Sequence, residues 1–194
     1  MAAVGGLVLA AGEGRRFGGS KLVAELDGRP LLEHVLAAMS ATSLERVVCV
    51  LGADAHEVLR RVDLHGAEPV LCEGWAEGQA ASLRSGVEAL ADAEAIVIVL
   101  GDQPLLSPAA VERVLDARGG AALAVRATHD GVPSHPTLVE RPLFNALREL
   151  RGDRGARDLL ARAETREVPC EGLGSAADID TVADLAALRA GTSS

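Results

Sequence analysis

Residues 4–21 read VGGLVLAAGEGRRFGGSK, in which an apolar run from Val4 to Leu9 leads directly into a loop rich in glycine. We interpret the apolar run as a buried strand. Glycine has no Cβ and tolerates positive φ, so the N–H groups of such a loop can turn toward an anion. Arg16 and Lys21 add positive charge to the loop, and Lys21 is the only lysine among the 19 basic residues. A phosphate group is the ligand that this loop suits best.

The length and composition narrow the class of protein. A chain of 194 residues with 48% hydrophobic residues can bury one core, and it contains no repeat or long linker, so we expect a single domain over residues 1–194. The net charge of −9 argues against nucleic acid as a partner, because a protein that neutralises many phosphates needs a basic face. Aromatic residues make up only 2% of the chain, which leaves almost no platform for stacking bases. A small phosphorylated ligand is therefore expected.

Cysteine usage and hydropathy indicate the compartment. Cys49, Cys72 and Cys170 are too few and too scattered for a disulfide framework, and they form no Cys-x-x-Cys pair that would suggest zinc. The first apolar run is too short for a secretory signal, and no apolar run approaches the roughly 18 residues of a membrane span. We expect a soluble cytoplasmic protein that does not bind membranes.

Short β-branched runs alternate with helical patterns along the whole chain. The expected strands are residues 4–9, 47–51, 69–72, 95–100, 121–126 and 136–139. The expected helices are residues 30–40, 55–62, 79–90, 108–117, 142–150, 154–162 and one that begins at Thr181. Such alternation predicts an α/β fold, with helices on both faces of a mostly parallel, Rossmann-like sheet in three layers. Residues 128–142 interrupt the rhythm, and we interpret them as a segment inserted on the substrate side.

In sheets of this kind ligands bind beyond the carboxyl ends of the strands. The loops after Leu9, Cys72 and Leu100 are therefore expected to share one edge. The apolar run 95–100 delivers Asp102 to that edge, and a carboxylate beside phosphate oxygens needs a bridging cation, a task suited to Mg²⁺. The alternative is that Asp102 only opens a turn before Pro104.

Two common phosphate loops can be compared with the first loop. A P-loop fails, because Ser20 separates Gly19 from Lys21 and Leu22 follows the lysine. A dinucleotide fingerprint fits better, but the Gly12–Gly18 run has one residue too many and no helix begins at once. An oxidoreductase that binds NADPH or a flavin dinucleotide therefore remains an alternative, with Asp54 as the acid for the ribose.

The loop has the pattern Ala-Ala-Gly-x-Gly-x-Arg-Phe-Gly…Lys at residues 10–21, which resembles the signature loop of the nucleoside-triphosphate transferases. That group includes molybdenum-cofactor nucleotidyltransferases and sugar-phosphate nucleotidylyltransferases, whose fold is the same kind of α/β domain. Residues 178–185 resemble its Asp-Ile-Asp-Thr-x-x-Asp-Leu end. Ser134-His135-Pro136 and residues 150–157 resemble a Gly-His-Pro … Leu-x-Gly-Asp-x-Gly-Ala-Arg stretch of molybdenum-cofactor cytidylyltransferase-like proteins, although Ser134 replaces the usual glycine.

The resemblance implies roles for individual residues. It implies triphosphate, base and ribose contacts for Leu9, Ala10, Ala11, Gly12, Gly14, Gly78 and Ser82. Arg16 and Lys21 would then act catalytically on transition-state and leaving-group charge, and Asp102 with Asp180 would hold Mg²⁺. Residues 1–105 would bind the nucleotide, and residues 106–194 would supply the acceptor side and the C-terminal helix.

Three of these roles have structural alternatives. Ser82 could simply belong to the first turn of a helix. Thr181 and Asp184 have the spacing of a capping box, so much of the last motif is structural and Asp180 is the acid left for metal. His135 either orients the acceptor or braces its own loop, and the arginine-rich stretch that includes Arg154 either binds an anionic acceptor or forms surface ion pairs.

The resemblance implies a Mg²⁺-dependent enzyme that transfers a nucleotidyl group from a nucleoside triphosphate to a phosphorylated acceptor and releases pyrophosphate. Ala11 and Gln103 resemble the branch that transfers CMP from CTP, so the implied acceptor is molybdopterin that carries molybdenum, and a molybdoenzyme apoprotein is a conceivable partner. Besides the oxidoreductase, a non-catalytic carrier of the cofactor is an alternative. The two carboxylates Asp102 and Asp180 favour catalysis, because a carrier has little use for a metal site.

Overall fold

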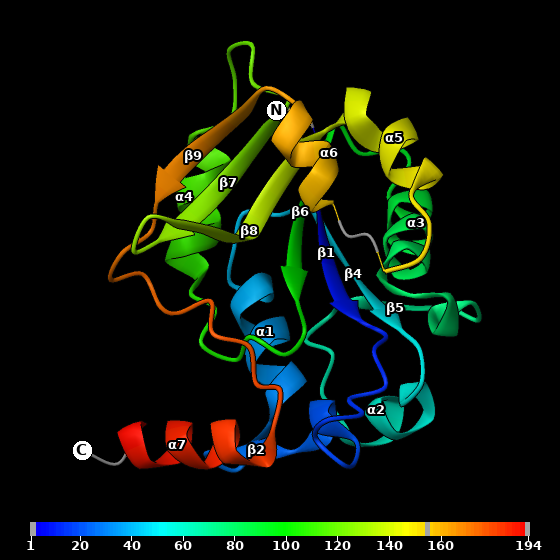
Figure 1. The fold of residues 1–194 in the computed structure, drawn as a ribbon, viewed down its shortest axis with the longest axis vertical. Helices are drawn as coiled ribbons and strands as arrows, with labels where there is room; N and C mark the ends of the chain where they lie inside the picture. Colours follow the sequence, from blue (N-terminus) through cyan, green and yellow to red (C-terminus); the bar gives the residue numbers. More distant parts are fainter. Residues whose placement is uncertain (1–2, 154–155, 193–194) are drawn as a thin grey trace.

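A computed structural model describes residues 3–153 and 156–192 of the chain. Its centre is a seven-stranded sheet in the order β5-β4-β1-β6-β8-β7-β9 (Figure 1). The strands are β1 (Val4–Ala10), β4 (Arg46–Leu51), β5 (Glu68–Leu71), β6 (Ala95–Leu100), β7 (Ala124–His129), β8 (Val132–Glu140) and β9 (Thr165–Pro169). β5, β4, β1 and β6 are parallel, β8 is antiparallel to both of its neighbours, and β9 is parallel to β7. The predicted mostly parallel α/β fold is confirmed.

Helices cover both faces of the sheet. They are α1 (Leu31–Ser40), α2 (Ala55–Arg61), α3 (Gln79–Ala89), α4 (Pro108–Asp116), α5 (Phe144–Glu149), α6 (Arg157–Arg162) and α7 (Val182–Thr192). Side chains of α1, α2 and α4 pack in one apolar cluster on one face, and those of α3, α5 and α6 pack in a second cluster on the other. The structure therefore has the three predicted layers. None of the helices in the described residues is long and apolar enough to cross a membrane.

The central strand β1 shows why this sequence forms a buried strand. Leu7 and Val8 are both fully buried, yet Leu7 belongs to the α3 layer and Val8 to the α1 layer. Successive side chains of a strand point to opposite faces, so a strand covered on both sides must be apolar throughout. Burial of a leucine or valine side chain contributes about 1.5–3 kcal/mol. The same strand ends at the edge of the sheet where the glycine-rich loop begins.

Residues 128–142 are not the inserted segment that we expected. Most of them form the end of β7 and the whole of β8, which lies in the sheet between β6 and β7. Asp130 and Gly131 both have positive φ (51° and 73°), as a two-residue type I′ hairpin requires. An Asp-Gly pair between strands is a hairpin signal, and our interpretation overlooked it. A second Asp-Gly pair, Asp27-Gly28, joins β2 (Glu25–Leu26) to β3 (Arg29–Pro30), and we did not predict that hairpin either.

Several element bounds also differ from the prediction. The strand expected at 121–126 lies at 124–129, and the helix expected at 142–150 is a 3₁₀ turn followed by α5. The helix expected at 154–162 is described from Arg157 onward. Strand β9 was missed, because it lies at the edge of the sheet and its pattern is mostly polar, with Val168 as its one buried residue.

Candidate functional site

The loops after β1, β5 and β6 share one edge of the sheet, as predicted. A cleft of about 220 Å³ lies there, between the ends of β1 and β6 and the start of α3. Five of the residues that we expected to contact a nucleotide line it: Leu9, Ala11, Gly12, Gly78 and Ser82. Ala10 does not, because its side chain is buried in the opposite layer of the core, so only its backbone could reach a ligand.

A second cleft of about 480 Å³ adjoins the first and is lined by Gly14, Arg16, Lys21 and Asp180. Gly14 has a φ of +62°, a conformation that side chains rarely adopt, and its carbonyl accepts a hydrogen bond of 2.8 Å from the Phe17 N–H. The glycine therefore lets the chain turn sharply and brings both cations to one cleft. We interpret this cleft as the place for a polyphosphate.

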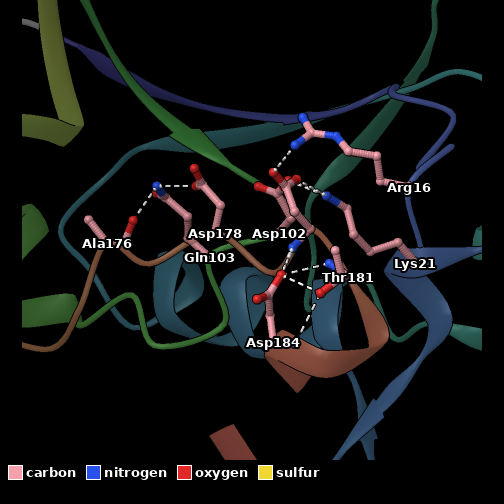
Figure 2. A network of polar contacts seen from close by, with 9 residues as sticks. Arg16, Lys21, Asp102, Gln103, Ala176, Asp178, Thr181 and Asp184 are labelled. Carbon is pink, nitrogen blue, oxygen red and sulfur yellow. Dashed lines mark hydrogen bonds and ion pairs between the residues drawn. The ribbon is translucent and has the colours of Figure 1, made fainter. Parts of the chain in front are cut away.

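Two carboxylates and two cations meet where the two clefts adjoin, Asp102 in the wall of the first and Asp180 in that of the second. Figure 2 shows Arg16, Lys21 and Asp102 close together. The Lys21 Nζ lies 2.6 Å from Asp102 Oδ2 and 3.3 Å from Asp180 Oδ1. The Arg16 Nη1 lies 3.1 Å from Asp180 Oδ2. The Lys21 side chain is 11% exposed, whereas that of Arg16 is 78% exposed. Lys21 is thus a fixed, shielded charge between the carboxylates, and Arg16 is the cation that can turn toward a ligand.

Asp180 comes from a segment distant in sequence that is fastened to the end of β6. The Ile179 N–H donates to the Asp102 carbonyl at 3.0 Å. Gln103 is 2% exposed, and its Nε2 donates to the Ala176 carbonyl at 2.9 Å and to Asp178 Oδ1 at 2.8 Å. These bonds hold the segment along the strand end, so the two carboxylates of the site are placed relative to each other by backbone.

The capping box that we predicted is present at the start of α7. The Asp184 N–H donates to Thr181 Oγ1 at 3.2 Å, and Asp184 Oδ2 accepts from the Thr181 N–H at 2.7 Å. The hydrogen bonds from Thr181 lower the pKa of Asp184. Asp180 precedes this cap, and its carboxylate points to the cations instead.

The donor set fits a divalent cation that shares its ligands with a substrate. Asp102 and Asp180 reach the same ammonium, so their carboxylates can also reach one cation. Within residues 3–153 and 156–192, no group of three or more histidine, cysteine, aspartate or glutamate side chains could hold a metal ion by itself. Mg²⁺ is commonly held by one or two carboxylates, with phosphate oxygens and water completing its shell.

A third cavity, of about 500 Å³, lies beside the strand ends and is lined by Gln103, Arg126, His135, Arg157 and other residues. Burial, with a smaller effect of Arg126, lowers the pKa of His135 to about 4, so its imidazole is neutral near pH 7. His135 thus lines this cavity, and its contact with an acceptor stays a prediction; Arg154 lies outside the described residues.

Ser134, at the position where glycine is usual, does not adopt a positive φ. Its carbonyl accepts hydrogen bonds from Arg126 Nε at 3.3 Å and from Thr137 Oγ1 at 3.1 Å. The departure from glycine is therefore compatible with the backbone of this loop.

Two residues of the site, Trp75 and Arg126, were not singled out in the sequence. Trp75 lines both the 220 Å³ and the 480 Å³ cleft, and its only signal is that it is the single tryptophan of the chain. Asp153, which belongs to the arginine-rich stretch that we considered for an anionic acceptor or for surface ion pairs, lines the 480 Å³ and the 500 Å³ cavities, and its carboxylate lies against Gly78, where a Cβ would collide with it. Arg126 lines the 500 Å³ cavity from β7, and nothing in the local sequence distinguishes it from other arginines.

The family model described as a MobA-like NTP transferase domain matches residues 6–168 of the chain. Nicotine blue oxidoreductase of Paenarthrobacter nicotinovorans is 31% identical, and the match covers 92% of this chain and 93% of that protein. The bifunctional protein GlmU of Rhodospirillum rubrum is 33% identical over 58% of this chain, which amounts to only 25% of GlmU.

Solved structures with the same fold include proteins of similar length. The crystal structure of Rv0371c from Mycobacterium tuberculosis H37Rv is 31% identical, with a TM-score of 0.88, and the match covers 98% of this chain and 100% of that one. A crystal structure of Rv0371c in complex with manganese has a TM-score of 0.84 at 28% identity, over 97% of this chain and 98% of that one.

Proposed function

Because the chain belongs to the family of MobA-like NTP transferase domains, we propose that it transfers a nucleotidyl group, CMP from CTP, to a phosphorylated acceptor of the molybdopterin type. The observation that carries the proposal is the meeting of Lys21, Asp102 and Asp180 beside the glycine-rich loop. These residues come from three separate segments, and a turn without a ligand would not require the two carboxylates beside it.

In this reaction an oxygen of the acceptor phosphate attacks the α-phosphorus of CTP, and the bond from that phosphorus to the bridging oxygen of pyrophosphate breaks. No side chain of the protein has to act as a nucleophile. The backbone N–H groups at Gly12 and Gly14 would bind the triphosphate, and Arg16 and Lys21 would stabilise the charge that builds up on the leaving group. Catalysis then consists of alignment and electrostatic stabilisation.

Asp102 and Asp180 would hold Mg²⁺ together with phosphate oxygens. The bound metal would supply Lewis-acid stabilisation of the phosphate charge. The manganese complex of Rv0371c supports a divalent metal in a protein of this kind. The choice of CTP and of a pterin acceptor depends on the resemblance at Ala11 and Gln103 and at residues 134–136 and 150–157.

The two halves of the chain would divide the work. The 220 Å³ cleft at the ends of β1 and β6 would hold the base and ribose, with Ser82 and Trp75 in its wall. The 500 Å³ cavity, whose wall includes His135, would hold the acceptor. Residues 1–105 would then bind the nucleotide and residues 106–194 the acceptor, and delivery of the product to a molybdoenzyme apoprotein would follow.

A thermal-unfolding panel with CTP, GTP, UTP, ATP, NADPH and FAD, each with and without Mg²⁺, tests the proposal. A ligand at 100 times its Kd stabilises the folded state by about 2.7 kcal/mol. We expect a Mg²⁺-dependent rise in Tm with CTP that exceeds the rise with the other nucleotides. A shift with GTP or another triphosphate in place of CTP would retain the transferase and reject the cytidylyl donor.

A second candidate is an oxidoreductase, favoured by the name of the relative that matches nearly the whole chain, nicotine blue oxidoreductase. The first loop gives it little support. After β1 the chain passes through a 3₁₀ turn and the β2–β3 hairpin before α1 begins at Leu31, so the helix that should begin directly after the glycines of a dinucleotide fold does not do so. A metal-independent Tm shift with NADPH or FAD, and none with any triphosphate, would make this the better proposal.

A further inference from the structure

Arg126 is a half-buried cation that has no carboxylate partner in the described part of the chain. Its guanidinium donates to the Ser134 carbonyl through Nε and to the Pro133 carbonyl through Nη2, both at 3.3 Å. Among the residues that the structure describes, no aspartate or glutamate oxygen lies within ion-pair distance of it. Long bonds to two neutral carbonyls compensate the burial of a full positive charge poorly.

Another partly buried arginine shows the usual arrangement. Arg118, whose side chain is 24% exposed, donates to both oxygens of Glu140 at 2.7 and 2.9 Å, and this pairing raises its pKa. The pKa of Arg126 is instead lowered, first by burial and then by the positive charge of Arg157, while Glu167 offsets this only in part. The protein therefore keeps two arginines close together where a paired carboxylate would be expected.

The surroundings of this charge are those of a ligand cavity. Arg126 and Arg157 both line the 500 Å³ cavity, whose wall also contains the neutral His135 and the apolar Ile98 and Leu160. Three aspartates, Asp153, Asp158 and Asp178, line other parts of the wall, but none of them forms an ion pair with Arg126 in the described part of the chain. Lys21, Asp102 and Asp180 do not line this cavity. Gln103 and Asp178 do line it, and they are the chain neighbours of Asp102 and Asp180, so the cavity lies next to the carboxylates of the site. A negative group bound beside Arg126 and Arg157 would thus face two cations, apart from the cations of the glycine-rich loop.

We propose that Arg126, together with Arg157, binds an anionic group of the acceptor, a phosphate or a carboxylate other than the phosphate that reacts beside Lys21. The assignment to the acceptor rests on the proposed function, whereas the anion site itself does not. It makes Arg126 a specificity-determining residue, because an acceptor that lacks the second anion would leave both arginines without a counter-charge.

The competing explanation is that Arg126 braces its own loop through the two carbonyls. The Arg126→Met variant distinguishes the brace from the anion site, because methionine retains much of the apolar stem of arginine and removes the charge. If the arginine is kept for a ligand, the free variant should unfold at a Tm equal to or above that of the wild type. A Tm clearly below that of the wild type would identify a structural brace and would overturn the proposal.

Inorganic phosphate serves as the probe for the anion site. Tm is followed against phosphate concentration at constant ionic strength, in an Arg16→Met background that weakens binding at the glycine-rich loop. We expect Arg126→Met to raise the half-saturating phosphate concentration about tenfold or more, the effect of one lost charge-assisted hydrogen bond. Arg113→Met is the matched control, because Arg113 also donates to a backbone carbonyl, that of Pro169 at 3.2 Å, but does not line the cavity.

Equal phosphate responses in the Arg126→Met and Arg113→Met proteins would refute the anion site. The rise in Tm caused by Mg²⁺ and CTP is measured with Arg126→Met alone and with Arg113→Met alone, in each case with Arg16 intact. We expect both values to match that of the wild type, because neither Arg126 nor Arg113 lines the 220 Å³ or the 480 Å³ cleft. If the wild type itself shows no such shift, the proposed function fails, and the phosphate comparison still decides the role of Arg126.

Discussion

Lys21 is the residue on which the proposed chemistry depends most. It is the single lysine of the chain, and its ammonium lies between Asp102 and Asp180. A fixed charge aimed at a developing negative charge typically contributes 10²- to 10³-fold to turnover, so we expect Lys21→Met to lower kcat by about that factor. The measurement is pyrophosphate release under saturating substrates.

Arg60→Met is the control for this change, because Arg60 is exposed on α2 and lines none of the three cavities of the site. A Lys21→Met protein that turns over as fast as the Arg60→Met protein would remove Lys21 from the catalytic assignment. The folded state of both variants should be verified by far-UV circular dichroism before the comparison.

His135 makes the stability of the protein depend on pH. Its pKa is about 4 in the folded protein, against an ordinary value of 6.5, so between pH 6.5 and pH 4 the unfolded chain binds a proton at this histidine that the folded protein does not bind. The contribution of His135 to the free energy of unfolding is therefore fully present above pH 6.5 and falls by about 3 kcal/mol as the pH is lowered toward 4. His135→Gln should remove this dependence.

Chemical denaturation at several pH values checks the prediction. The difference in unfolding free energy between the wild type and the His135→Gln variant should shrink by about 3 kcal/mol from pH 7 to pH 4. Because all other groups are common to the two proteins, a difference that stays constant with pH would show that the histidine can be protonated without cost in the folded state.

At the scale of elements, α3 packs closely on β1, and residues at the end of β1 and the start of α3 line the 220 Å³ cleft. Gly86 of α3 faces Leu7 of β1, and a Cβ at residue 86 would overlap the Leu7 methyl groups and lie 3.0 Å from its Cγ. Leu7 is fully buried and has no free space to yield. We expect Gly86→Ala to lower the free energy of unfolding by about 1–3 kcal/mol, the typical cost of overpacking.

In a helix, alanine is more favourable than glycine by up to about 1 kcal/mol. A Gly86→Ala protein that is more stable than the wild type would therefore mean that this gain in helix propensity is larger than the free-energy cost of the overlap with Leu7. The control is Glu88→Ala, an exposed position on the same helix, which should change stability by no more than about 0.5 kcal/mol. Urea denaturation of the three proteins decides between the outcomes.

A small apolar cluster also joins separate segments of the site. Phe17 of the glycine-rich loop packs against a cluster that contains Leu26 of the β2–β3 hairpin, Ile179 and Leu185 of α7. The loop that carries Arg16 and the segment that carries Asp180 are thus fastened to one apolar group. Their relative position is a property of packing between elements, and no local pattern of the sequence reveals it.

At the scale of the whole molecule, charge is distributed unevenly. The chain has a net charge of −9, yet one edge of the sheet gathers Arg16 and Lys21, and the 500 Å³ cavity beside it gathers Arg126 and Arg157. A body of this charge repels polyanions, while a pair of cations in each place can bind one anionic group even though carboxylates line the same cavities. This distribution agrees with a protein that joins two small phosphorylated molecules.

The order of the strands explains why the site forms at this place. β1 and β6 are neighbours and both end at the same edge, so Gly12 and Asp102, which are far apart in the sequence, lie in the wall of one cleft. The chain then returns from β9 along the strand ends, with the Ser175 N–H donating to the Leu105 carbonyl at 3.1 Å. Asp180 reaches the site on this return.

The amino-acid sequence determined the α/β class, the parallel part of the sheet, the shared edge of the loops and the capping box at Thr181. Each of these depends on local periodicity or on residue types within a few positions, which a sequence displays directly. The sequence also contained the Asp130-Gly131 hairpin signal, which our interpretation of residues 128–142 missed.

Only the tertiary structure decided what distant residues do to one another. The contacts of Lys21 with Asp102 and Asp180, the neutral state of His135 and the closeness of Arg126 to Arg157 all depend on segments that are apart in the chain. Burial and Coulomb interaction are properties of distances in space, and these are fixed when the sheet forms and the helices pack on it. Position along the sequence does not encode them.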